Sequence, residues 1–218
     1  MSTSQTLETL NNAIKSGDVE TVRGIITAQP DLLRSSDAPV TPLLLSVYYR
    51  HTAVTQAILE SGLELTLHEA AATGNTAGAA TILDAQPDTI NSLSADGFPP
   101  LGLACYFNHP ETVRLLLQRG AEVNQHAQNT QQVAAIHAAV SARSLEITRM
   151  LIEHGADVNA TQQQAVVPLH AAAMNGDAEI LHELLKHGAE KHRRDANGKS
   201  ALDYAREAGF DSLLEVLS

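Results

Sequence analysis

The chain has 218 residues and a formal net charge of -11, from 14 Lys and Arg against 25 Asp and Glu, and such an acidic surface argues against nucleic-acid binding. The single cysteine, Cys105, cannot form an internal disulfide, which suits a reducing compartment. The N-terminus lacks a basic start followed by an apolar run, and no apolar stretch approaches the ~20 residues of a membrane span, so we expect a soluble cytoplasmic protein.

Composition also favours a layered architecture over a single compact core. Aromatic residues make up only 3% of the chain, which contains no Trp, while Ala and Leu are abundant. Large aromatic side chains fill the centre of most compact domains, whereas thin layers of short helices pack with Ala and Leu. This balance favours repeats.

A regular sequence pattern recurs along the chain. Each copy starts with an apolar residue followed three positions later by a small one, and the starts are Leu10, Leu43, Leu67, Leu101, Ile136, Leu169 and Leu202. Seven positions after each start, mostly as helix-ending Gly or Asn, stand Gly17, Arg50, Gly74, Asn108, Arg143, Gly176 and Gly209. A second amphipathic stretch with paired aliphatic residues follows, such as Leu116-Leu117. Each unit is therefore predicted to be two short antiparallel helices that stack on their neighbours.

The segments Thr41-Pro42-Leu43, Ile136-His137, Pro168-Leu169-His170 and Gly155–Ala160 resemble the repeat motifs of the ankyrin-repeat family. This resemblance implies a mainly α, curved solenoid of paired antiparallel helices with short β-hairpin fingers. We expect an N-terminal tail over residues 1–6 and a single array of about seven repeats over residues 7–218. The first and last repeats are expected to act as caps.

One interval departs from the regular spacing. Leu67 stands only 24 positions after Leu43, whereas the other starts are 33 to 35 positions apart, so the finger between the second and third repeats is predicted to be missing. The two glutamine-rich fingers, residues 124–132 and 161–164, are interpreted as solvated turns.

The resemblance implies that partners bind the concave face, with contacts at the two positions before each helix-ending residue. The predicted partner-binding residues are Tyr48, Tyr49, Ala72, Thr73, Tyr106, Phe107, Met174 and Asn175. Four of the seven aromatic residues fall in this set, and they flank the small pair Ala72-Thr73, which predicts a recess beside the missing finger. The alternative is that these aromatics pack on neighbouring repeats.

Histidine, cysteine and basic side chains are further candidates for functional sites. By the resemblance, His68, His137 and His170 are structural residues that hydrogen-bond adjacent turns, and no metal site or cofactor is expected. Cys105 is predicted to be a buried, unreactive thiol, so we expect no enzyme. A basic group near the C-terminus is either an anchor for an acidic partner segment or a solvated finger tip, and it comprises Lys191, Arg193, Arg194 and Lys199.

The sequence thus predicts a protein–protein interaction module that acts in trans as an adaptor, inhibitor or stabiliser. The expected partner is another protein rather than a nucleic acid or a membrane, and the free chain is expected to be a monomer. One alternative is a small-molecule binder or minor enzyme that uses the recess near Ala72-Thr73. A second is a structural repeat protein that self-associates.

Overall fold

A computed structural model describes residues 3–34 and 40–218, and residues 1–2 and 35–39 lie outside the description. The described residues form seven helix pairs, numbered here as repeats 1 to 7. The first helices of the pairs are α1 (Thr3–Ser16), α3 (Pro42–Tyr48), α5 (Leu67–Thr73), α7 (Pro100–Tyr106), α9 (Ala135–Ser141), α11 (Pro168–Asn175) and α13 (Ala201–Glu207). The second helices are α2 (Val19–Ala28), α4 (Thr52–Leu59), α6 (Thr76–Ala85), α8 (Pro110–Gln118), α10 (Leu145–Glu153), α12 (Ala178–Lys186) and α14 (Asp211–Leu217). Short 3-10 turns lie at η1 (Pro30–Arg34), η2 (Pro87–Asn91) and η3 (Gln163–Ala165).

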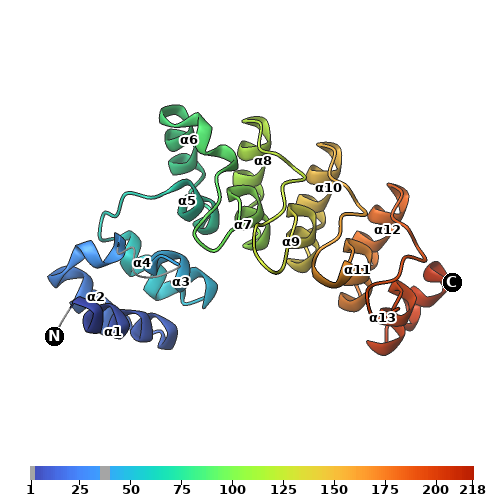
Figure 1. Cartoon of the computed structure of the whole chain (residues 1–218), viewed down its shortest axis with the longest axis horizontal. Helices are drawn as coiled ribbons and strands as arrows, with labels where there is room; N and C mark the ends of the chain where they lie inside the picture. Colours follow the sequence, from blue (N-terminus) through green and yellow to red (C-terminus); the bar gives the residue numbers. More distant parts are fainter. Residues whose placement is uncertain (1–2, 35–39) are drawn as a thin grey trace.

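The pairs stack side by side into one elongated array, which confirms the predicted helical solenoid (Figure 1). The helices α6, α8, α10 and α12 form one row, with the first helices of their pairs beside them (Figure 1). The second helix of repeat 2, α4, lies outside that row, and α1–α4 are turned relative to the rest (Figure 1). The array therefore has a break between repeats 2 and 3.

The turn inside each pair has the predicted left-handed residue. All seven positions have positive φ, from 56° at Arg143 to 78° at Gly209. At Gly74 there is also no room for a side chain, because a Cβ atom there would lie 2.5 Å from the ring of His109. The helix-ending positions read from the sequence are thus the places where the chain reverses.

The first helix begins earlier than expected. Helix α1 starts at Thr3, so the tail predicted over residues 1–6 is wrong for residues 3–6, and residues 1–2 lie outside the described part. Thr6 and Leu7 are buried with Leu10 in the core of the first pair, and this burial holds the extra turn in helical form.

The fingers between repeats are turns with isolated antiparallel bridges, such as His126 with Ala134, instead of extended strands. Single backbone hydrogen bonds join successive fingers: Gln128 N–H to Gly97 O at 2.8 Å, Gln163 N–H to Gln131 O at 2.9 Å, and Ala196 N–H to Gln164 O at 2.8 Å. From repeat 3 to repeat 7 the fingers therefore form one connected edge.

The link between repeats 2 and 3 is at most half as long as the links that follow α6, α8, α10 and α12. It consists of residues 60–66, between α4 and α5. The longer links are residues 86–99, 119–134, 154–167 and 187–200. The Tyr48 hydroxyl of repeat 2 donates a hydrogen bond of 2.7 Å to Asp96, which lies in the finger between repeats 3 and 4.

Buried apolar side chains form two clusters that follow the same division. One cluster lies within α1–α4 and contains Leu10, Ile14, Val22 and Leu43. The other runs without interruption from α5 to α14, and Leu44 of α3 joins it. Below, residues 3–59 are called the N-terminal unit and residues 67–217 the C-terminal unit.

A buried carboxylate ties the two units together. The Glu69 side chain, at the start of α5, is 0% exposed and accepts two hydrogen bonds from the Arg34 guanidinium, at 2.9 and 3.0 Å. Thr41 Oγ1 donates to the same carboxylate at 2.7 Å, and the backbone N–H of Thr66 donates at 2.9 Å. Burial alone would raise the pKa of Glu69, but these bonds hold it below its usual range. Arg34, Thr41 and Glu69 are called the junction clasp.

Candidate binding grooves

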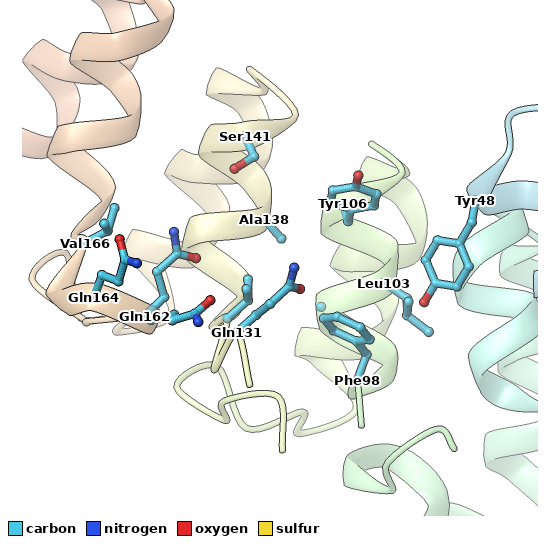
Figure 2. A pocket seen from close by; sticks show the side chains of 13 residues that line it. Tyr48, Phe98, Leu103, Tyr106, Gln131, Ala138, Ser141, Gln162, Gln164 and Val166 are labelled. Atoms are coloured by element: carbon cyan, nitrogen blue, oxygen red, sulfur yellow. The ribbon is translucent and has the colours of Figure 1, made fainter. Parts of the chain in front are cut away.

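One candidate site is a groove of about 550 Å³ on the finger side of the array (Figure 2). Residues from repeats 2, 4 and 5 and from the three fingers between repeats 3 and 6 line it. They are Tyr48, Phe98, Gly102, Leu103, Tyr106, Gln131, Val133, Ala138, Ser141, Gln162, Gln163, Gln164 and Val166. This cavity is called the finger groove.

The finger groove has an apolar wall and an amide rim. Figure 2 shows Tyr48, Leu103, Tyr106 and Phe98 grouped at one end, while Gln131, Gln162 and Gln164 reach in from the fingers at the other. None of the described residues that line it is charged, although the chain as a whole carries a net charge of -11. Each glutamine amide offers both donors and an acceptor. The groove can therefore take apolar side chains and hydrogen-bond a neutral main chain beside them.

Aromatic packing fixes the position of this wall. The Tyr48 and Phe107 ring centroids lie 5.6 Å apart, and Tyr106 meets Phe107 edge-on at 5.1 Å. Tyr48 thus reaches from repeat 2 to repeat 4, past the small side chains of repeat 3. Burial and the hydrogen bond to Asp96 raise the pKa of Tyr48, so its hydroxyl stays protonated and donates.

A second groove of about 530 Å³ lies along the turns between the two helices of repeats 2 to 5. It is lined by Val47, Arg50, Thr52, Thr55, Gln56, Leu59, Ala72, Thr73, Tyr106, Phe107, Asn108, His109 and Ala142. This cavity is called the turn groove. Tyr106 is a wall of both grooves, and its side chain is 46% exposed.

The structure divides the residues that the sequence predicted as a single binding set. Tyr48 and Tyr106 line the finger groove, and Tyr106 also lines the turn groove together with Ala72, Thr73 and Phe107. Ala72 is buried and contributes the floor.

The remaining predicted positions line neither groove: Tyr49, Met174 and Asn175. Tyr49 is 47% exposed and stacks on His51, Met174 is 53% exposed, and Asn175 donates to the Val140 carbonyl at 3.4 Å.

Ala72 and Thr73 line the turn groove, but they do not lie beside the missing finger as expected. These residues end α5, whereas the short link 60–66 enters the other end of that helix. A helix of this length spans about 10 Å, so the two features face opposite edges of the array.

Sequence reasoning missed the residues that form the amide rim. Glutamine-rich fingers are typical of solvated turns, yet Gln131 and Gln162–Gln164 line the finger groove. The available signal was their recurrence in two consecutive fingers. Phe98, in the finger before repeat 4, was missed because it lies outside the family's contact positions.

The histidines predicted to be structural make the expected bonds. His137 Nε2 lies 3.0 Å from Ala160 O, His170 Nε2 lies 2.9 Å from Arg193 O, and His68 Nε2 lies 2.9 Å from Ser92 O. Burial lowers the pKa of His137 to about 4. These rings therefore link each repeat to the finger that follows it.

The basic group near the C-terminus is compensated locally. Arg193 lies 3.1 Å from Glu190, Arg194 lies 3.4 Å from Asp203, and Lys199 lies 2.6 Å from Glu207. Three of its four cations, Lys191 being the fourth, thus already face a carboxylate of this chain, which weakens the group as an anchor.

Cys105 is fully buried, and burial raises the pKa of its thiol, which disfavours the reactive thiolate. Across residues 3–34 and 40–218, no three His, Cys, Asp or Glu side chains are arranged to hold a metal ion. No helix within the described residues has both the length and the apolar composition needed to cross a bilayer.

Two family models match the chain. One, for ankyrin repeats in three copies, matches residues 67–162, and the other, for ankyrin repeats in many copies, matches residues 151–205. The chain belongs to the ankyrin-repeat family. Ankyrin repeats are protein–protein interaction modules, so this protein carries such a module. The matched segment begins at Leu67, the first residue of α5, which is also where the C-terminal unit begins.

Proposed function

We propose that this ankyrin-repeat protein acts in trans as an adaptor, inhibitor or stabiliser of a partner protein, and that a segment of the partner lies in the finger groove. The observation that carries the proposal is Tyr106, a 46% exposed aromatic that stands as the shared wall of two grooves. Tyr is favoured at interfaces because it buries a large area and keeps a polar tip, and such anchors often supply about 2 kcal/mol or more.

The lining of the finger groove suggests how that segment is held. Glutamine amides at the rim match the N–H and C=O groups of an extended main chain, while Leu103, Val133 and Val166 receive apolar side chains. Because the lining is neutral within an acidic protein, a charged side chain in this groove would lose its hydration without gaining an ion pair. The proposal therefore favours an extended, uncharged segment of the partner.

The experiment compares two exposed tyrosines that differ in position. The full chain is used as bait in its wild-type, Tyr106→Ala and Tyr49→Ala forms, and bound proteins from the native host are quantified by mass spectrometry. Tyr49 is a matched control because it is 47% exposed and lines neither groove. Circular dichroism checks that each form is folded.

At least one protein is expected to bind the wild type and Tyr49→Ala equally and to fall about tenfold or more on Tyr106→Ala. Equal retention on all three baits, or equal loss on both variants, would contradict the proposal. Once a partner is known, its activity and half-life with and without this protein separate inhibition, recruitment and stabilisation.

The second candidate is a small molecule in the turn groove. The observation in its favour is a cleft of about 530 Å³ lined by both apolar and polar side chains, within the usual size of ligand sites. Native mass spectrometry of the purified protein tests this alternative through a bound mass that leaves on denaturation. Catalysis is not part of either proposal.

A further inference from the structure

One arginine stands apart from the others. The chain has ten arginines, and nine form ion pairs within the part that the structure describes: Arg23, Arg34, Arg114, Arg119, Arg143, Arg149, Arg193, Arg194 and Arg206. Arg50 forms none with the described residues, although the chain has 25 acidic residues. Its side chain is exposed and lines the turn groove.

Repeat 5 shows the same position with a carboxylate partner inside the chain. Arg143 is the counterpart of Arg50, and both occupy the left-handed turn of their pair, with φ of 56° and 57°. Arg143 pairs with Asp177, the N-cap of α12, at 3.6 Å. The N-cap of α6, which corresponds to Asp177, is Asn75, an uncharged amide. Arg50 thus keeps the cation of this position while the next repeat no longer supplies its carboxylate.

The surroundings of Arg50 match an anion next to an apolar group. Among the described residues that line the turn groove none is acidic, and Arg50 is the one permanent cation. Burial lowers the pKa of His109, so that ring is neutral at pH 7. Val47, Leu59 and Phe107 supply apolar surface in the same groove. A guanidinium offers five donors in a planar fork that fits a carboxylate.

We propose that the turn groove binds a segment of the partner protein in which one Asp or Glu carboxylate pairs with Arg50 and an adjacent apolar side chain packs on Val47, Leu59 and Phe107. This inference rests on the proposed function, because it extends the same partner around Tyr106, the wall that the two grooves share. The net charge of -11 repels a strongly acidic partner, so the segment carries an isolated carboxylate.

The test uses two uncharged-end dipeptides that differ only in the carboxylate, N-acetyl-Leu-Glu-amide and N-acetyl-Leu-Gln-amide. Each is titrated into the 15N-labelled full chain and followed by NMR. The Glu peptide is expected to bind about three- to tenfold more tightly than the Gln peptide, because the pair is charge-assisted but exposed. Shifts are expected at residues 50–56 and 106–109, and the preference is expected to fall with added salt.

Two matched variants make the result decisive. Arg50→Gln is expected to remove the preference for Glu, whereas Arg143→Gln, the same change at the corresponding turn, is expected to keep it. Equal affinity for both peptides, an equal effect of the two variants, shifts confined to other surfaces, or no saturable shift at millimolar peptide would each overturn the inference.

The two proposals can fail separately. A partner that is lost on Tyr106→Ala but kept in full on Arg50→Gln would contradict the pair with Arg50 and leave the proposed function in place, since Tyr106 lines both grooves. A partner that is lost on Arg50→Gln but kept on Tyr106→Ala would do the reverse.

Discussion

The N-terminal and C-terminal units are built from the same helix pair but are packed differently. In the C-terminal unit, α6, α8, α10 and α12 form a row and the fingers are bonded one to the next (Figure 1). In the N-terminal unit, α4 lies out of that row, and all its buried apolar side chains named here except Leu44 form a cluster of their own. The repeated motif thus sets the pair, whereas the length of the link sets how one pair sits on the next.

The contacts across the break are fewer than those between other neighbouring first helices, and they combine apolar contacts of Leu44 and Tyr48 with polar bonds. The junction clasp and the bond from Tyr48 to Asp96 stand where other neighbours share a finger edge. In a stack where each repeat touches only its neighbours, stability is a sum of local terms, and a weaker interface separates cooperative units. We therefore expect the two units to unfold in separate steps.

The largest effect is expected when one core side chain of each unit is truncated. Leu10→Ala and Leu151→Ala each remove a fully buried leucine and are expected to cost about 3 kcal/mol. Because these two leucines belong to different core clusters, Leu10→Ala should shift only the transition of the N-terminal unit and Leu151→Ala only that of the C-terminal unit. Urea unfolding followed by circular dichroism measures both transitions. An equal shift of both transitions by either substitution would show that the two units unfold as one.

The next test breaks the junction clasp. Arg34→Ala leaves the buried Glu69 carboxylate without its cation and is expected to destabilise the N-terminal unit by about 2 kcal/mol, reduced from the value for fully buried pairs because Arg34 is partly exposed. Arg23→Ala is the control, since the Arg23–Glu60 pair is exposed on both sides and should matter little. A similar loss from both variants would show that the clasp has no special role.

A pH series separates the units without mutation. The pKa of His137 is about 4 when folded, below its ordinary value near 6.5, so its contribution is complete above pH 6.5 and is lost as the pH falls toward 4. By pH 5 the C-terminal unit should lose about 2 kcal/mol relative to pH 7.5. Thermal unfolding at both pH values measures this, and His137→Gln should flatten the dependence.

The clasp should respond at lower pH. The pKa of Glu69 is also lowered on folding, so the contribution of this carboxylate is present above about pH 4.5 and disappears as the pH falls through its folded value. An N-terminal unit that weakens as early as the C-terminal unit would contradict this order.

The smallest expected effect comes from one hydroxyl. Tyr48→Phe removes the donor to Asp96 and keeps the ring on Phe107, so about 1 kcal/mol of the contact between units should be lost. Asp96 still accepts from Ser94 Oγ, which limits the cost. The urea transition of the N-terminal unit measures the change. A shift in the transition of the C-terminal unit alone would contradict a role of Tyr48 in the contact between the units.

Much of this fold can be predicted from the sequence because the patterns that determine it lie within single repeats. Apolar spacing within a single repeat predicts both helices of a pair, and the left-handed residue at their turn is a single-residue property. The short interval from Leu43 to Leu67 predicts the short link between α4 and α5.

Other parts depend on contacts between distant residues. Glu69 meets Arg34 from 35 positions away, and Tyr48 meets Asp96 from 48 positions away. Both contacts depend on how far repeat 2 moves when its finger is lost, which spacing does not encode. For the same reason the predicted aromatic set divided between two grooves and left Tyr49 outside both.

Native-state hydrogen exchange of the wild-type chain, read by mass spectrometry at increasing urea, tests most directly whether the break divides the array. We expect two exchange free energies, one shared by peptides from α1–α4 and one shared by the inner helices α7–α11, with the change falling at residues 60–66. A single free energy and a single urea dependence across α3, α5 and α7 would contradict it.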